Sequence, residues 1–506
     1  MTDFVQPKAV EMAADVKELK QEDLATKQTD QEDLASTKQT DEEDWLSSLP
    51  DDILSSILER LQLHEAARTS ILSRRWRYLF IFRSQVVIDA DAFHYKDNKS
   101  SMLALGDLAQ RNACVVKATK SMLAQSSQCP ISLLRIRFHL VEESIGIIHH
   151  VDGALSDRKI ATVHFLILPE GHRTEDELVT NGRRFMRFFY AGPRAFTNLS
   201  YLHIHHLMLS IDDVVNVLNT CKKLEHLIFQ SCECGFESVL QIEHPHLTTL
   251  VFDGCIFGKI ELNWLPSLKC FSYWTWFFSQ DQYPLSLGYV PQLSTLNLRN
   301  QASIMHKSIR LSELLCNATI SLLDLDFECE RIWVEPEAPK VFGPLFQYLQ
   351  ILILQNIHEE CDLDWTMFFL EAAPLLKQVS IKVWDHACYN SAEEWQDMYQ
   401  KGYNLPRWEA RADLKHCNLK VLAIKGYQVE EKFTTYIRRV VEAAANLKLI
   451  LLSHSGSCEQ CEFSPSTRYP RTHEERLQIK EQIEEWRSSP LKIGFEPLEC
   501  RPSPTK

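Results

Sequence analysis

The chain reads Leu224-Glu225-His226-Leu227-Ile228-Phe229 and, one interval later, Leu247-Thr248-Thr249-Leu250-Val251-Phe252. In both copies a leucine is followed three and five positions later by further hydrophobic residues. The last two hydrophobic positions alternate with their neighbours, which is typical of a short strand with one side against a core. The two stretches therefore predict two copies of one structural unit.

The same pattern recurs on both sides of this pair. Clear copies are Leu199-Leu202-Ile204, Leu268-Phe271-Tyr273, Leu293-Leu296-Leu298 and Leu349-Leu352-Leu354, and weaker ones begin at Leu133, Val163, Leu376, Leu419 and Leu447. From Leu199 to Leu293 successive copies are 21 to 25 residues apart. This period is that of leucine-rich repeats, whose units gain a core only by stacking on neighbours. We expect an α/β repeat solenoid over residues 131–409.

Residues 1–44 differ from the repeats in composition. They contain 13 acidic residues and 5 lysines, so they hold −8 of the formal net charge of −14. We expect this segment to be a disordered acidic tail. The remainder has no broad basic character, so nucleic acid is not expected as a partner.

A compact helical block is predicted to follow from Trp45. Pro50 and Asp51 suit a helix start, and Ser73 can cap the last of three short helices, after a second one from His64 to Leu72. An apolar stripe on the first helix consists of Ile53, Leu54, Ile57, Leu58 and Leu61.

This block resembles the F-box motif, because Leu49-Pro50-Asp51-Asp52-Ile53-Leu54 is followed by Glu65-Ala66-Ala67-Arg68-Thr69-Ser70-Ile71-Leu72-Ser73-Arg74-Arg75-Trp76. The resemblance implies an F-box over residues 45–82 that inserts a helix into a groove of a Skp-type adaptor. Trp76 is either a second anchor or part of the local core. The expected contact residues are Leu49, Pro50, Asp51, Ile53, Leu54, Ile57, Leu58 and Trp76.

The rest of the chain looks like plant F-box proteins with leucine-rich repeats and a C-terminal FBD region. The FBD-like part is expected over residues 410–490, with Asn418 to Ile424 and Asn446 to Leu452 as its strands. Residues 83–130 are expected to be a linker with the first helices of the repeat body, and 491–506 a tail. The irregular stretch from Asp385 to Arg411 interrupts the repeat period.

The resemblance implies a non-catalytic role, as the substrate-recognition subunit of a Skp, cullin and F-box ubiquitin ligase. An F-box scaffold or a small-molecule co-receptor, neither transferring ubiquitin directly, is the alternative. We find no phosphate-binding glycine loop and no nucleophile motif, and we expect no cofactor. Scattered cysteines, the lack of a secretory signal and the lack of a membrane segment favour an intracellular protein in the nucleus or cytoplasm.

No metal site is expected. Cys458 and Cys461 lie near His454 and His473, but the second well-spaced ligand pair of a zinc site is missing. His203 and His205 could share a ligand on one strand face, although a satisfied or solvent-facing pair is favoured. Cys232 and Cys255 follow strands at a position where repeats bond the turning backbone, and we interpret both as structural.

Strand geometry also predicts a target-binding surface. The residue after the second inward-facing position of each strand should point outward, which aligns His205, Gln230, Asp253, Trp274, Arg299, Asp326 and Gln355 in one row. An exposed Trp274, flanked by Asp253 and Arg299 and with Asp326 beyond them, would have the features of an interaction hot spot; the alternative is a stray surface aromatic or one tucked beneath a loop. Trp276, Phe277 and Phe278 are expected to pack in the return segment of the repeat.

Overall fold

A computed structural model describes most of the repeat body and the helical block before it. The described residues are 48–93, 105–124, 130–157, 159–168, 174–276, 284–300, 308–315, 318–328, 332–359, 361–384, 408, 411, 413–455, 468–486 and 490–496. The acidic segment 1–44, Phe277, Phe278, Cys458, Cys461 and almost all of Asp385 to Arg411 lie outside them. The chain divides into a first unit, Met1–His172 with Arg184–Ser200, and a second unit, Arg173–Arg183 with Tyr201–Lys506.

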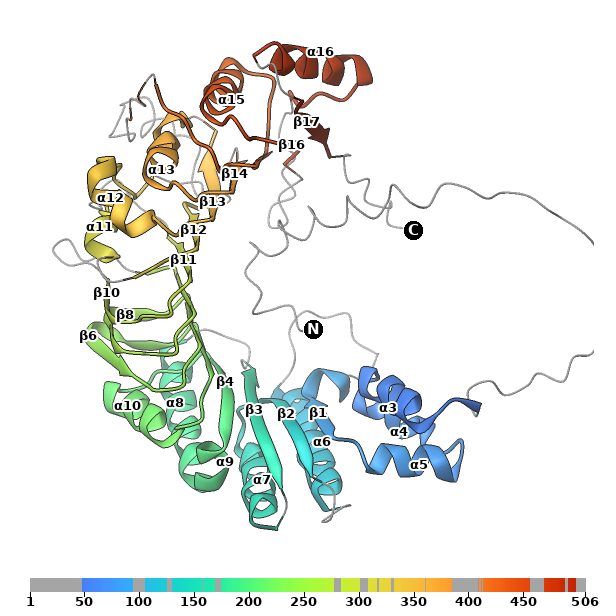
Figure 1. Ribbon diagram of the computed structural model, residues 1–506. Helices are drawn as coiled ribbons and strands as arrows, with labels where there is room; N and C mark the ends of the chain where they lie inside the picture. The colour runs from blue at the N-terminus through green and yellow to red at the C-terminus, as the bar shows by residue number, and fades with distance from the viewer. Residues whose placement is uncertain are drawn as a thin grey trace, which may run out of the picture. The chain divides into compact units, whose positions relative to one another are not determined.

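The first unit begins with three short helices, α3 (Asp51–Arg60), α4 (Leu63–Thr69) and α5 (Arg74–Ile81). A parallel sheet follows, in the order β1 (Gln85–Asp89), β2 (Ile131–His139) and β3 (Ile160–Leu168). The other helices are α6 (Leu105–Ala124), α7 (Ile145–Asp157), α8 (Glu175–Ala191), whose first part belongs to the second unit, and α9 (Pro193–Thr197). Helix α6 packs on β1, β2 and α7 (Figure 1). Strand β1 lies in a region that the sequence predicted to be linker and helix.

The second unit is built on one long parallel sheet, with strand order β4-β5-β7-β9-β11-β12-β13-β14-β15-β16-β17. The strands are β4 (Leu199–His205), β5 (His226–Gln230), β7 (Thr249–Asp253), β9 (Cys270–Trp274), β11 (Thr295–Arg299), β12 (Leu322–Asp326), β13 (Ile351–His358), β14 (Gln378–Trp384), β15 (Val421–Lys425), β16 (Leu449–Ser453) and β17 (Lys492–Phe495). Each repeat copy predicted in this unit therefore contains a strand. The solenoid architecture predicted from the repeat period is confirmed.

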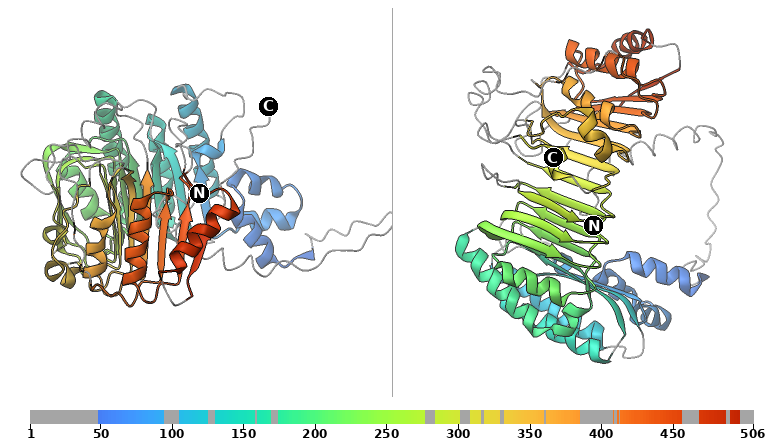
Figure 2. Two further views of the ribbon diagram at one scale, coloured as in Figure 1. Left: turned by 90° about the horizontal axis from the view of Figure 1, so that it is seen from above. Right: turned by 60° about the vertical axis from the view of Figure 1, so that its left-hand side comes forward.

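The segments that return between these strands are of two kinds. Those after β5, β7 and β9 contain β6 (Glu233–Glu243), β8 (Ile256–Trp264) and β10 (Leu285–Tyr289), which form a second parallel sheet in the order β10-β8-β6. Other returns contain helices: α10 (Ile211–Thr220), α11 (Leu311–Leu314), α12 (Pro339–Phe346), α13 (Met367–Ala372), α15 (Glu431–Ala443) and α16 (His473–Glu484). Helices α11 to α13 lie on the side of the main sheet where β6, β8 and β10 lie (Figures 1 and 2).

The core of the second unit lies between the main sheet and these return segments. Alternate strand residues point into it, so Leu227 and Phe229 of β5 and Leu250 and Phe252 of β7 are at most 2% exposed. Phe229 and Phe252 stack with their ring centroids 5.1 Å apart. The expected inward positions are confirmed, and the intervening residues must therefore face the other side of the sheet.

A left-handed residue after several strands keeps the strand ends in line. Ser231, Gly254 and Thr275 have φ values of 50°, 59° and 59°. Their amides donate to the carbonyl oxygens of Asp253 (2.7 Å), Trp274 (3.1 Å) and Arg299 (2.8 Å) on the next strand. The chain therefore turns at the same height in each repeat, which aligns the last residues of neighbouring strands.

Candidate functional site

The helical block of the first unit buries one side of its apolar stripe and exposes the other. Leu54 and Leu58 are fully buried against α5, whereas Ile53 is 45% exposed and Ile57 is half-buried. Trp76 is 6% exposed, so of its two expected roles the structure favours the local core. Five of the predicted adaptor contacts are accessible, namely Pro50, Asp51, Ile53, and the half-buried Leu49 and Ile57. The other three, Leu54, Leu58 and Trp76, are buried in the core of the block.

Polar contacts fix the arrangement of these helices. The Arg75 guanidinium forms an ion pair with Asp51 at 2.6 Å and donates from Nη2 to the Leu49 carbonyl oxygen at 2.5 Å. The Ser73 hydroxyl accepts a bond from the Trp76 amide at 3.3 Å, which confirms the expected cap. Asp51 therefore joins the start of α3 to α5, in addition to any contact it makes with a partner.

Two exposed hydrophobic residues on the same block were not among the predicted contacts. Ile71 is 79% exposed and Leu72 is 65% exposed, in the turn between α4 and α5. Exposing two adjacent aliphatic side chains is costly, because each would gain about 1.5–3 kcal/mol on full burial. Their position in a turn, where polar residues are the rule, was the signal in the sequence that could have identified them.

The second unit aligns the predicted outward row. Strand registers pair His205 with Gln230, Gln230 with Asp253, Asp253 with Trp274, Trp274 with Arg299, Arg299 with Asp326 and Asp326 with Gln355. We call these residues the strand-end row. Its geometry is confirmed, whereas its role in target binding stays a prediction.

One expectation about the row was wrong. Trp274 is half-buried rather than exposed, and Asp326 and Gln355 are each only 8% exposed. Neighbouring side chains in a parallel sheet lie about 4.8 Å apart, so large residues in one row cover each other. The accessible part of the row consists of His205, Gln230, Asp253, Trp274 and Arg299, all of which are half-buried.

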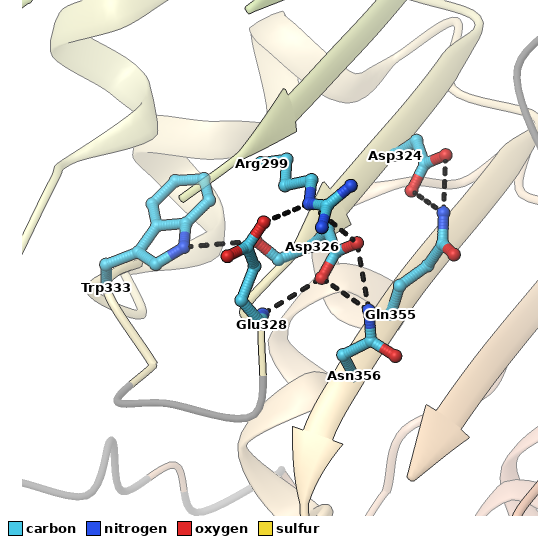
Figure 3. A network of polar contacts seen from close by, with 7 residues as sticks. All are labelled: Arg299, Asp324, Asp326, Glu328, Trp333, Gln355 and Asn356. Atoms are coloured by element: carbon cyan, nitrogen blue, oxygen red, sulfur yellow. Dashed lines mark hydrogen bonds and ion pairs between the residues drawn. The ribbon is translucent and has the colours of Figure 1, made fainter. Parts of the chain in front are cut away.

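A polar network holds the middle of the row (Figure 3). Arg299 bonds to the Glu328 carboxylate and forms an ion pair with Asp326 at 3.7 Å. The Asp326 carboxylate also accepts bonds from the Glu328 amide at 2.9 Å and from Asn356 Nδ2 at 2.8 and 3.0 Å. Burial by itself would lower the pKa of Arg299, but Asp326, Glu328 and Asp253 outweigh it and raise that pKa. Three carboxylates around one guanidinium leave this region formally negative.

A second row beneath the first is also polar, although it is almost fully buried. Gln355 donates from Nε2 to both oxygens of Asp324, at 2.8 and 2.9 Å, and Asn297 donates to the Ser272 hydroxyl at 2.9 Å. Asp324, Asn297 and Ser272 are at most 5% exposed. These hydrogen bonds fix the buried polar side chains on this face of the sheet. The bond between Gln355 and Asp324 also holds one residue of the strand-end row in place.

The remaining predicted residues have structural roles. Cys232 and Cys255 are buried, and their thiols donate to the carbonyl oxygens of Ile204 (3.6 Å) and Phe229 (3.3 Å) of the preceding repeat. His203 Nε2 lies 3.1 Å from Gln230 Oε1. Within the described ranges, no group of histidine, cysteine and acidic residues is arranged to hold a metal ion. Among those same residues, no helix is long and apolar enough to cross a bilayer.

Comparison with known proteins matches both parts of the chain. Residues 46–81 match the F-box domain, and residues 190–485 match the At1g61320/AtMIF1 LRR domain, so the two models cover the helical block and most of the second unit.

Three Arabidopsis thaliana relatives illustrate the range of similarity. The F-box/LRR-repeat protein At3g58880 is 56% identical over 374 residues, 67% of this chain and 77% of the relative. The F-box/LRR-repeat protein At4g14103 is 46% identical over 57 residues, 11% of this chain and 15% of the relative. The FBD-associated F-box protein At5g22720 is 24% identical over 219 residues, 42% of this chain and 44% of the relative. The matched part is thus less than two thirds of the length of the last two relatives. On the match to At3g58880 and on the repeat-domain match, this chain belongs to the family of F-box proteins with leucine-rich repeats.

Proposed function

We propose that the chain is the substrate-recognition subunit of a Skp, cullin and F-box ubiquitin ligase. The single observation that carries this proposal is the exposed apolar surface on an F-box block whose own core is already filled. Ile53 of α3 and Ile71 and Leu72 of the turn between α4 and α5 are exposed, whereas Leu54, Leu58 and Trp76 are buried. Such a surface on a folded helical block fits a helix-in-groove contact with a Skp-type adaptor.

In this role the chain supplies proximity instead of chemistry. A target held on the second unit is brought to a high effective concentration near subunits that transfer ubiquitin. The strand-end row is the proposed target surface, because it combines the accessible edge of Trp274 with charged groups that Asp326 and Glu328 hold in place. The proposed compartment is intracellular, in the nucleus or the cytoplasm.

The test is affinity purification of the full chain expressed with a Skp-type adaptor and cullin. Replacing Ile53 and Leu72 by Asp should abolish adaptor recovery, since each exposed anchor contributes about 1.5–3 kcal/mol and a charge buried in the groove costs more. The matched control is Leu477→Asp on α16, because Leu477 is also 45% exposed on a helix. Undiminished adaptor binding by the Ile53 and Leu72 variant would refute the proposal.

The same purification tests the target surface. Trp274→Ala should keep adaptor and cullin but lose the proteins that the intact chain recovers on its second unit. Trp264→Ala, which removes a tryptophan that is 44% exposed on the second sheet, should change neither. If the Trp274 variant retains every partner, recognition lies on another surface. Recovery of the adaptor without cullin would instead favour a scaffold that does not transfer ubiquitin.

A further inference from the structure

A row of lysines lies at the start of the last strands of the second unit. Lys377, Lys420 and Lys448 each precede the first residue of β14, β15 and β16. The Lys420 amide donates to the Lys377 carbonyl at 2.8 Å, and the Lys448 amide donates to the Lys420 carbonyl at 2.9 Å. Lys492 does not extend the series, because the strand register pairs it with Leu449 and not with Lys448. We call Lys377, Lys420 and Lys448 the lysine row.

The positive charges of this row are not compensated within the described residues. All three side chains are exposed, and none forms an ion pair in that part of the chain. Lys377 Nζ donates to the uncharged Gln350 amide at 2.7 Å. Like charges at neighbouring positions of adjacent strands repel each other, so this arrangement reduces stability slightly. It also runs against the formal net charge of −14.

The earlier repeats do not share this feature. The equivalent position before β7, β11, β12 and β13 is occupied by Thr248, Ser294, Ser321 and Gln350, and before β9 by a single Lys269. Only the last repeats place lysines on successive strands. The positive charge is therefore a local property of this end of the solenoid and not of the repeat pattern.

Exposed apolar side chains lie beside the lysine row. Leu375 and Tyr348 occupy the equivalent position two residues before Lys377 and Gln350, and they are 41% and 49% exposed. In the next two repeats this position holds Asn418 and Asn446, whose amides donate to the carbonyl oxygens of Pro374 (2.8 Å) and Cys417 (2.6 Å). The surface thus joins a positive row to a small apolar edge at β13 and β14.

We infer that the lysine row binds an acidic segment of a partner protein that also carries an apolar side chain. The positive charge of the row favours a polyanionic partner. The exposed aliphatic Leu375 beside the row favours a protein among such partners. Single-stranded nucleic acid sites need aromatic platforms for stacked bases, and one tyrosine at the margin is a poor platform. This surface is separate from the strand-end row and adds a second contact to the proposed function.

The experiment measures binding of a short fluorescent peptide of glutamate and leucine to the full chain. The variant K377Q/K420Q/K448Q should bind it roughly tenfold more weakly, since each exposed ion pair contributes little but three add. Lys269→Gln, the same position in the β9 repeat, should leave the affinity unchanged. Leu375→Ser should weaken binding a few-fold, and added salt should weaken it in the intact chain.

Several results would overturn the inference. One is equal binding of the same peptide with glutamine in place of glutamate. Another is an equal loss of affinity in the Lys269 variant, which would show a general charge effect. A third is displacement of the peptide by a single-stranded oligonucleotide of equal charge at lower concentration. Adaptor recovery should be normal in all these variants. A negative result with the peptide would therefore not contradict the proposed function, and a failure of the proposed function would not affect the peptide measurement.

Discussion

The middle and the late repeats of the second unit use the same strand but return in different ways. Between β5 and β11 the returns contain β6, β8 and β10, whereas α12, α13 and α15 return the chain around β13 to β16. The inward residues of the main strands are equally buried in both regions, as Leu250 and Phe252 of β7 and Leu422 and Ile424 of β15 show. The stacked strands therefore define the fold, and the return segment only has to cover the core.

The return type follows from local sequence. In β8 the buried residues Ile260 and Leu262 alternate with less buried neighbours, as expected of a strand. In α15 the buried Phe433, Tyr436, Ile437, Val440 and Val441 recur with the helical period. The two regions also differ in charge, because carboxylates gather at the strand ends of β7 and β12, and lysines at the strand starts of β14 to β16.

The largest effect is expected where the two kinds of repeat meet. Trp333 is 1% exposed, and its ring lies 5.1 Å from Trp276 of the middle repeats and 5.4 Å from Phe327 after β12. We expect Trp333→Ala to lower the free energy of unfolding by about 3–5 kcal/mol, because a large buried ring leaves a cavity. Urea denaturation measures this. Trp264→Ala should lower the free energy of unfolding much less. Comparable losses in the two variants would show that Trp333 does not hold the two kinds of repeat together.

Much of this architecture could be predicted from the sequence because strand residues carry it. The spacing of Leu227 and Phe229, and of Leu250 and Phe252, fixes which side chains point inward, and the strand-end row follows from alternation alone. The buried state of Trp276 was likewise predicted correctly.

Features that depend on neighbouring repeats could not be predicted in this way. The half-burial of Trp274 results from side chains of adjacent strands, and the network of Arg299 with Glu328 joins residues 29 positions apart. The lysine row was overlooked for the same reason, because Lys377, Lys420 and Lys448 become neighbours only through strand pairing. A residue's environment in a solenoid is set by equivalent positions in the next repeat, and irregular intervals obscure which positions these are.

An intermediate effect is expected from a matched pair of glycines. A side chain on Gly288 of β10 would meet the Asn263 and Leu262 carbonyl oxygens at 2.8 and 2.9 Å, whereas one on Gly343 of α12 would meet nothing within 4 Å. Gly288→Ala should therefore cost about 1–3 kcal/mol of unfolding free energy through overpacking. Gly343→Ala should stabilise the protein by about 0.5–1 kcal/mol, because alanine loses less entropy in a helix. Thermal denaturation with the same sign for both variants would contradict this difference between strand and helix returns.

The smallest effect is expected from a buried histidine that occurs in both the middle and the late repeats. His244 and His416 each lie three residues before a buried leucine, and their Nδ1 atoms accept bonds from the Leu247 and Leu419 amides, both at 3.0 Å. Their Nε2 atoms lie 3.0 Å from the Cys221 carbonyl oxygen and 2.9 Å from that of Ala373. Each ring must therefore be neutral with its proton on Nε2, because a proton on Nδ1 would face an amide hydrogen. Burial lowers the pKa of both histidines, against a smaller opposing effect of the carbonyl bond.

The sign of the pH dependence follows from these lowered pKa values. As pH falls below the ordinary histidine pKa, these histidines bind protons in the unfolded chain but remain neutral in the folded chain. The free energy of unfolding therefore decreases with acidification. Both histidines should contribute to this loss, on a background to which His358, whose pKa burial lowers to about 4, also contributes. His244→Gln and His416→Gln should both lower stability at pH 7 and reduce its slope between pH 7 and about 5.5. Chemical denaturation across this range measures both. If only one variant flattens the slope, the equivalence of the two regions fails at this position, and the two rings titrate in different surroundings despite their matching bonds.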